Sequence, residues 1–289
     1  MGLFVALSFG SVYPIAKPAL AIVDPLLFSS SRYLLAGVLM LAALAITGSQ
    51  WRVERRDIAK LTLLGIVGYT VFQAGWSYGL NITTPAKAVV LIATTPIFGA
   101  LLGRILGEKL SLFGWLGILL AFSGVFVVIN NSFSELNLAG STILGDALYV
   151  GIAAIWALYG ALSRATLLRL GTLRTTGWSA VIGSLLLAPL ALPGALAQDW
   201  TAVDTATLAA FLYCAIMVGC FGLCAWGGGL ARLGLTRISA YLYLSPICGV
   251  VLSGLVLGHW LSQVQLIGAG AVLLGVALTQ TLGKPAAQS

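Results

Sequence analysis

Aromatic side chains and a few polar groups lie deep inside long hydrophobic stretches of this sequence, where they could bind a small molecule. Trp156 and Tyr159 are three residues apart in one stretch, and Gln73 and Trp76 have the same spacing in another. Each pair therefore shares one face of a helix. A cavity lined in this way suits a partly flat, apolar ligand with polar groups, and its rings could also hold an ammonium group. The candidate substrate-binding residues are Tyr13, Gln73, Trp76, Tyr78, Thr95, Trp156, Tyr159, Trp226, Tyr241 and Ser245.

A second interpretation of these residues stays open, namely hydrogen bonding between helices or an aromatic belt at the membrane surface. Prolines and glycines in the same stretches indicate where helices could bend or slide. A proline frees backbone carbonyls that must then be satisfied by neighbours or line a wet cavity. Glycines four residues apart form a smooth face, which serves either static packing or sliding. The candidate hinge or gating residues are Pro14, Pro96, Pro246, Gly103 and Gly228.

The composition indicates an integral membrane protein. Of the 289 residues, 60% are hydrophobic and 8% are charged, whereas about a quarter of the residues of a soluble domain are charged. The hydrophobic stretches each have about the 20 residues that a membrane-spanning helix needs. We therefore predict an all-α polytopic membrane protein with ten transmembrane helices. Their expected ranges are 2–20, 25–48, 58–80, 85–106, 112–130, 141–164, 174–196, 205–230, 236–257 and 262–281.

The sequence repeats itself after about 150 residues, which indicates a duplicated membrane domain. Pro96 corresponds to Pro246, and Trp76 corresponds to Trp226. Five helices per repeat is an odd number, so the second repeat must cross the membrane in the opposite direction. Such inverted repeats are typical of secondary transporters, whose substrate sites lie between the halves. The predicted repeats are residues 1–135 and 136–289, and further matched pairs are Gly99 with Gly249, Gly117 with Gly268 and Gly124 with Gly275.

Most of the fifteen basic residues fall on the connections after the second, fourth, sixth and eighth helices. By the positive-inside rule, both termini are expected to be cytoplasmic in the cell inner (plasma) membrane. The net charge of +7 then reflects topology, and no nucleic acid partner is expected. Lys17 and Arg32 lie toward the other side, where they either extend to the membrane surface or contact a substrate carboxylate. Because no Asp or Glu lies near a helix centre, facilitated or exchange-type transport is expected.

Other chemistries find little support in the sequence. The four cysteines all fall in the proposed eighth and ninth helices, and there is one histidine. A metal site or an intramembrane enzyme would need clustered His, Cys, Asp or Glu residues. No phosphate-binding loop for ATP is present. We therefore expect no enzyme activity, no cofactor and no metal, and a monomer whose partners are a small-molecule substrate and the lipid bilayer.

The order of several motifs resembles the drug/metabolite transporter superfamily, and within it the ten-helix EamA-domain exporters. They are FGSVYPIAK in the first helix, Arg32 early in the second, the segments Pro96–Leu110 and Pro246–Gly258, and GDALYVGIAAIWALYGALSR at residues 145–164. His259 departs from the pattern, because such proteins often carry Glu there.

The aromatic interior looks most like that of bacterial exporters of aromatic amino acids. The resemblance implies a secondary transporter that exports small amphipathic metabolites, above all amino acids including aromatic ones, by alternating access. Alternatives are export of a nucleoside, a sugar or a cationic drug and, remotely, an intramembrane enzyme.

Overall fold

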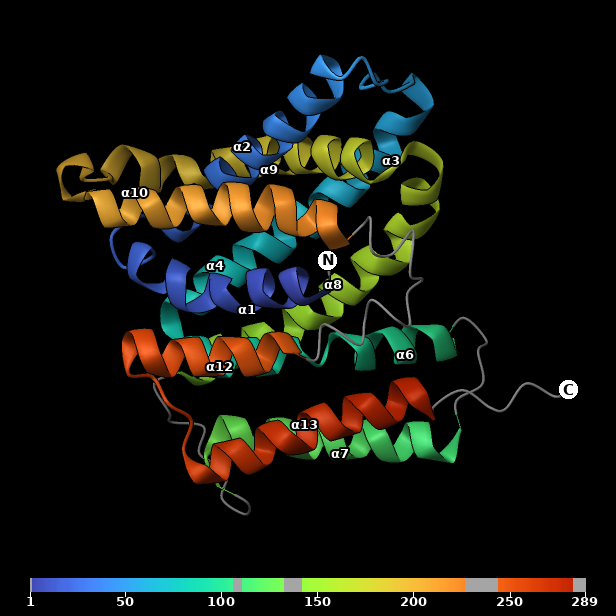
Figure 1. The fold of residues 1–289 in the computed structure, drawn as a ribbon, viewed down its shortest axis with the longest axis vertical. Coiled ribbons are helices and arrows are strands. Elements are labelled where there is room, and N and C mark those ends of the chain that lie inside the picture. The colour runs from blue at the N-terminus through green and yellow to red at the C-terminus, as the bar shows by residue number, and fades with distance from the viewer. Residues whose placement is uncertain (1, 106–110, 133–141, 227–243, 283–289) are drawn as a thin grey trace, which may run out of the picture.

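The computed structural model describes residues 2–105, 111–132, 142–226 and 244–282. Within these ranges every regular element is a helix, which confirms the predicted all-α class (Figure 1). Seven helical spans are long and apolar enough to cross a membrane, and two shorter apolar helices follow near the end of the chain. Together with the N-terminal helix, they are consistent with the ten spans predicted from the sequence. The chain is therefore a multi-pass membrane protein.

The first five predicted spans form eight helical segments. The third span combines α-helix and π-helix, and the fourth is interrupted after Ile92. The segments are α1 (Gly2–Ala19), α2 (Pro25–Ile46), α3 (Arg55–Gly65), η1 (Ile66–Val71), α4 (Phe72–Ile82), α5 (Pro85–Ile92), α6 (Thr95–Ile105) and α7 (Leu112–Asn130).

In the described part of the last five predicted spans, the sixth differs most from expectation, because it continues to Leu170 rather than ending at residue 164. No glycine or proline interrupts it between Gly160 and Gly171, and Gly171 adopts a positive φ of 82° that ends the helix. Residues 227–230 of the eighth span and 236–243 of the ninth lie outside the described residues. The elements are α8 (Ile143–Leu170), α9 (Thr172–Ala197), the short η2 (Trp200–Ala202), α10 (Thr205–Leu212), η3 (Tyr213–Gly222), α12 (Leu244–Leu257) and α13 (Gln263–Thr281).

Hydroxyl and carboxylate side chains fix where several helices begin. Asp24 accepts hydrogen bonds from the first turn of α2, and Ser262 forms a reciprocal capping box with Gln265 at the start of α13. Asp204 caps α10 in the same way. Hydrogen bonds from the Thr207 side chain and backbone hold the pKa of the Asp204 carboxyl below its usual value. These caps satisfy backbone donors that helix starts otherwise leave unpaired.

Helices α7 and α13 pack side by side at one end of the molecule (Figure 1), and their glycines make the contact. A Cβ on Gly124 would lie 2.5 Å from the Gly268 carbonyl oxygen, and Gly117 meets Gly275 in the same way. Gly117 is the sequence mate of Gly268, and Gly124 is the mate of Gly275. The contacts therefore join each glycine to the mate of the other, as a two-fold relation between the repeats requires.

The π-helical segments strengthen this relation. Segment η1 covers residues 66–71, and the equivalent positions about 150 residues later fall inside η3. Segments of π-helix are rare and are frequently found at functional sites. The two halves thus interrupt their third helices at matching places, while the exact boundary between residues 135 and 136 stays a prediction.

The fourth span breaks where the sequence predicts a bend at Pro96. Helix α5 ends at Ile92 and α6 starts at Thr95, so that the proline falls in the first turn of α6, where a missing N–H is tolerated. The hydroxyls of Thr94 and Thr95 donate to the carbonyls of Leu91 and Ile92, each at 2.7 Å. Its repeat mate Pro246 is buried on α12. The gating role of both prolines stays a prediction.

Candidate functional site

The Arg32 side chain, on the first part of α2, points into the protein and is 1% exposed. Its Nη2 atom donates to Gln73 Oε1 at 2.9 Å. Three rings surround the guanidinium, with Cζ at 4.1 Å from the centroid of Trp76, 4.7 Å from Tyr33 and 5.5 Å from Phe28. The sequence left two interpretations of Arg32, extension to the membrane surface or contact with a substrate carboxylate. The first is therefore wrong. Gln73 and the ring faces on α2 and α4 hold this cation inside.

Lys17 has a different environment. Its Nζ atom donates to the carbonyls of Leu80, Asn81 and Thr83 at 2.7, 2.7 and 2.9 Å. These carbonyls lie at the C-terminal end of α4, where a cation stabilises the helix dipole. Lys17 therefore connects α1 to α4, and its ammonium group already donates three hydrogen bonds to backbone carbonyls.

Rings from both halves meet beside Arg32. Tyr13 on α1 lies 5.7 Å from Trp76 and 6.1 Å from Tyr149 on α8, measured between ring centroids. The Tyr149 hydroxyl donates to the Trp76 carbonyl at 2.9 Å. Two predicted residues, Tyr13 and Trp76, thus lie together, and a residue of the second half joins them.

A second group of rings continues from this point along α8. Trp156 stacks on Tyr159 at 4.9 Å and lies 4.6 Å from Phe72. Tyr159 meets Tyr69 edge-on at 5.9 Å, and Tyr69 meets Tyr33 at 5.3 Å. We call the whole set the aromatic cluster; it consists of Tyr13, Phe28, Tyr33, Tyr69, Phe72, Trp76, Tyr149, Trp156 and Tyr159.

The remaining described candidates make no ring contact or side-chain hydrogen bond with this cluster within the described ranges. Tyr78 is 51% exposed, so the prediction that it lines a buried binding site is wrong. It follows Trp76 by two residues, so it projects from nearly the opposite side of α4. Thr95 is half-buried, with its hydroxyl bonded to the backbone, and Ser245 is buried on α12 with no hydrogen-bond partner for its hydroxyl among the described residues. Trp226 is half-buried at the end of a described range.

Most of the candidate hinge or gating residues lie within the described ranges. Pro14 is buried inside a continuous α1, and Gly103 is half-buried on α6. Gly99, one turn before Gly103, has no atom within 4 Å of an added Cβ, so this part of the glycine face is not packed against a neighbour among the described residues. Tyr241 and Gly228 lie outside the described residues.

Two buried carboxylates, which the sequence did not single out as site residues, connect α8 to the first half at its two ends. Asp146 is fully buried and lies 3.0 Å from Lys87 Nζ of α5, with Thr83 and Thr142 also donating to it. At the other end of α8, Arg169 pairs with Asp57 of α3 through both terminal nitrogens. Both acids fall in a first helical turn, which agrees with the prediction that none lies near a helix centre.

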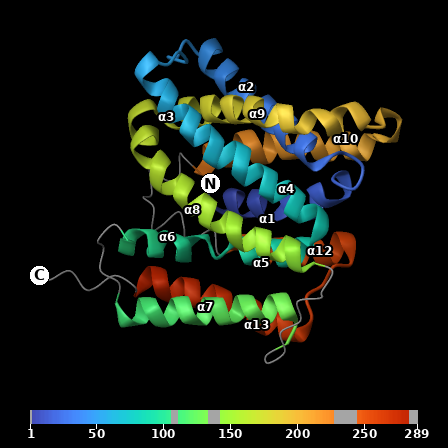
Figure 2. The ribbon, with the colours of Figure 1, turned by 180° about the vertical axis from the view of Figure 1, so that it is seen from behind.

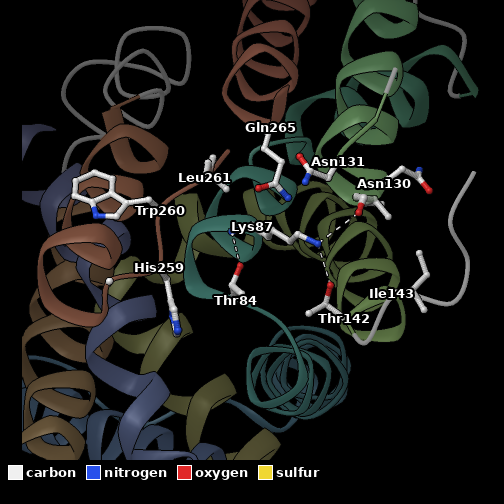
Figure 3. A pocket seen from close by; sticks show the side chains of 12 residues that line it. Thr84, Lys87, Asn130, Asn131, Thr142, Ile143, His259, Trp260, Leu261 and Gln265 are labelled. Carbon is white, nitrogen blue, oxygen red and sulfur yellow. Dashed lines mark hydrogen bonds between the residues drawn. The ribbon is translucent and has the colours of Figure 1, made fainter. Parts of the chain in front are cut away.

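A cavity opens at each end of α8. One has a volume of about 470 Å³ and is lined by Lys87, His259 and Gln265, among others (Figure 3). The other, of about 340 Å³, lies beside Leu170–Arg174 and includes Cys224. Helix α8 has 28 residues and is therefore about 42 Å long, with Tyr149, Trp156 and Tyr159 along its middle. The three α8 rings of the aromatic cluster thus lie between the cavities at the two ends of this helix, whose course Figure 2 shows.

Two related helical halves that meet at a shared group of side chains are typical of secondary transporters. The sequence comparisons agree. The model of the EamA-like transporter family matches residues 1–130 and again residues 143–281. The chain belongs to this family, within the drug/metabolite transporter superfamily, as its motifs indicate.

Several proteins resemble the chain along most of its length. A transporter from Archaeoglobus fulgidus without an assigned substrate is 29% identical, over 91% of this chain and 90% of its own. A probable terminal-alkyne amino-acid exporter from Streptantibioticus cattleyicolor is 28% identical, over 89% of this chain and 84% of its own. A probable amino-acid metabolite efflux pump from Salmonella typhimurium is 27% identical, over 96% of this chain and 92% of its own. A solved crystal structure with 20% identity shares the fold, with a TM-score of 0.67 over 97% of this chain and 95% of that one.

Sequence reasoning missed five members of the aromatic cluster, namely Phe28, Tyr33, Tyr69, Phe72 and Tyr149. Tyr149 precedes Trp156 by seven residues, which is two helical turns, so their shared helix face was a usable signal. Tyr33 follows Arg32 directly and gives no comparable periodic signal. Its position becomes clear only from the packing of α2 against η1.

Proposed function

We propose that this transporter exports small amphipathic metabolites, above all amino acids including aromatic ones, by alternating access between its two halves. The aromatic cluster carries this proposal. Its rings come from both halves, and those on α8 lie between the two cavities, so that a movement of one half against the other would alter the same set of contacts. Flat apolar side chains pack well on such rings.

Two relatives support the substrate class. Their names describe an exporter of a terminal-alkyne amino acid and an amino-acid metabolite efflux pump. We extend the common element of these names, an amino-acid-like solute moved outward, to this chain. The proposal includes an orientation with both termini in the cytoplasm, a plasma membrane location and halves that meet at residues 135 and 136.

The proposed transport is facilitated or exchange-type. Of the buried acids in the described part of the chain, Asp146 is occupied by Lys87 and Asp57 by Arg169. Neither is an unpaired carboxylate in the middle of a helix, where proton relays usually place one.

Uptake into liposomes tests the proposal directly. Labelled phenylalanine, tryptophan, threonine, uridine and glucose would be offered separately to liposomes that contain the purified protein and to protein-free liposomes. Saturable uptake of phenylalanine and tryptophan, with mutual competition, is the expected result. Uptake of only uridine or glucose would keep the transporter and overturn the substrate class. Uptake of none into protein-containing liposomes, both without internal solute and preloaded with the same unlabelled solute, would overturn the proposed function.

We expect Trp156→Ala to raise the KM for phenylalanine by about tenfold, which corresponds to a loss of about 1.4 kcal/mol of binding free energy. Trp156 is half-buried, stacks on Tyr159 and lies against the tilted ring of Phe72, so truncation removes a ring surface of the cluster. The matched control is Tyr78→Ala, which removes an exposed ring in the same protein and is expected to leave KM unchanged. Equal KM values for wild type and Trp156→Ala would place this ring in packing only.

A further inference from the structure

Arg32 is a buried cation without a carboxylate partner among the described residues. Its Nε and Nη1 atoms have no hydrogen-bond partner within the described ranges, and only Nη2 bonds to Gln73. Buried guanidinium groups are costly unless they are paired and hydrogen-bonded. Gln73 is neutral, so it supplies a hydrogen bond but no compensating charge.

Arg169 shows how this same chain satisfies an arginine that has a structural role. Both of its terminal nitrogens bond to the carboxylate of Asp57, although its side chain is 48% exposed. Arg32 is far more buried and has fewer partners among the described residues. The comparison indicates that the arrangement around Arg32 is completed by a group that the described residues do not supply.

The surroundings of Arg32 define what could complete it. Trp76 and Tyr33 cover the guanidinium, and Tyr13 lies against Trp76. The buried side chain of Cys214 is a further neighbour of the guanidinium. An anion with an attached apolar group would therefore meet a positive charge and ring faces together. Carboxylates are well matched to guanidinium, which can donate to both of their oxygens.

We propose that Arg32 binds the carboxylate of the transported solute and that the rings of Trp76 and Tyr13 pack against its apolar part. This inference rests on the proposed function and narrows it to solutes with a carboxylate. It requires a local rearrangement that brings the solute between the halves, which alternating access supplies. Decarboxylated amines of the same shape are then poor substrates, because they bring a second positive charge to Arg32.

The test is a competition experiment in liposomes with solutes that differ only in their charged groups. Uptake of labelled phenylalanine would be measured against unlabelled phenylalanine, 3-phenylpropionate, which lacks the amine, and phenethylamine, which lacks the carboxylate. For the wild type, both carboxylates are expected to compete at least about tenfold better than phenethylamine. In Arg32→Gln this preference is expected to disappear, and the KM for phenylalanine is expected to rise at least about tenfold.

Gln73→Glu provides a second variant in case Arg32→Gln does not fold. It places a carboxylate where Gln73 Oε1 already lies 2.9 Å from Arg32, so it supplies the missing charge and should fold at least as well. The new carboxylate competes with the solute, and the KM for phenylalanine is expected to rise at least about tenfold. Arg32→Lys, which keeps the charge but not the planar fork, is expected to retain part of the carboxylate preference.

The outcomes separate the two proposals. Phenylalanine transport whose KM and whose preference over phenethylamine are unchanged in Arg32→Gln, or in Gln73→Glu, would overturn the role of Arg32 and leave the proposed function standing. Wild-type transport of phenethylamine, uridine or glucose without any carboxylate solute would overturn both. Loss of the preference for carboxylates in Arg32→Gln, together with a raised KM for phenylalanine in Gln73→Glu, would support the role of Arg32 and the proposed function.

Discussion

Asp146→Leu is expected to lower the free energy of unfolding by about 3–5 kcal/mol, because it leaves the largely buried ammonium of Lys87 without its carboxylate. The Asp146 side chain is fully buried, and that of its partner Lys87 is 12% exposed. The substitution also removes the acceptor for the hydroxyls of Thr83 and Thr142. Breaking one side of a buried pair costs more than the pair itself contributes, because the remaining charge stays desolvated.

Chemical unfolding of the purified protein in detergent micelles measures this effect. The matched control is Glu54→Gln, which breaks an exposed pair with Arg56 and is expected to change stability by less than about 1 kcal/mol. The double variant Lys87→Met with Asp146→Leu is expected to recover most of the loss, since it leaves neither charge buried. A single Asp146→Leu variant as stable as the wild type would contradict the buried pair.

Gly275→Leu is expected to separate α7 from α13 and to cost at least about 2 kcal/mol of stability. A Cβ at this position would overlap the Gly117 carbonyl oxygen and lie 2.6 Å from the backbone nitrogen of Ala121. Backbone atoms on the facing helix cannot rotate away as a side chain can. In a membrane, where apolar burial drives helix association weakly, close backbone packing of this kind is a main source of helix contact.

Size-exclusion profiles and thermal unfolding of the variant would show this loss. Gly270→Ala is the matched control, because Gly270 lies on the same helix and an added Cβ there has no described atom within 4 Å. It is expected to be as stable as the wild type or slightly more so, since alanine favours a helix over glycine. If Gly275→Leu gave the same unfolding temperature as Gly270→Ala, the close α7–α13 crossing would be wrong.

The spans and their breaks follow closely from the sequence, because length, hydropathy and proline act locally. The interruption before Pro96 is of this kind, whereas the caps at Asp24 and Ser262 and the π-helical segments became clear only from the structure. The sequence repeat, whose matched residues include the glycines of α7 and α13, also predicted a long-range feature, namely two halves of opposite orientation. Their inverted relation appears directly in the contacts of Gly117 with Gly275 and of Gly124 with Gly268.

The binding candidates were harder to predict, because the rotation of each helix about its axis depends on its neighbours. Tyr78 and Trp76 are two residues apart and have similar chemistry, yet one is exposed and the other is buried. Arg32 and Asp146 lie near helix ends, where a charge can either reach the membrane surface or turn inward. Only the packing of α2 against α4, and of α8 against α5, decides between these outcomes.

Counterflow of phenylalanine tests most directly the claim that one amino-acid site faces the two sides of the membrane in turn. Liposomes that contain the protein would be loaded with unlabelled phenylalanine and diluted into a trace of labelled phenylalanine. The labelled solute is expected to accumulate transiently above its equilibrium level, and Arg32→Gln is expected to abolish this overshoot. Entry of the label at the same rate, without an overshoot, in protein-containing and protein-free liposomes would contradict the account.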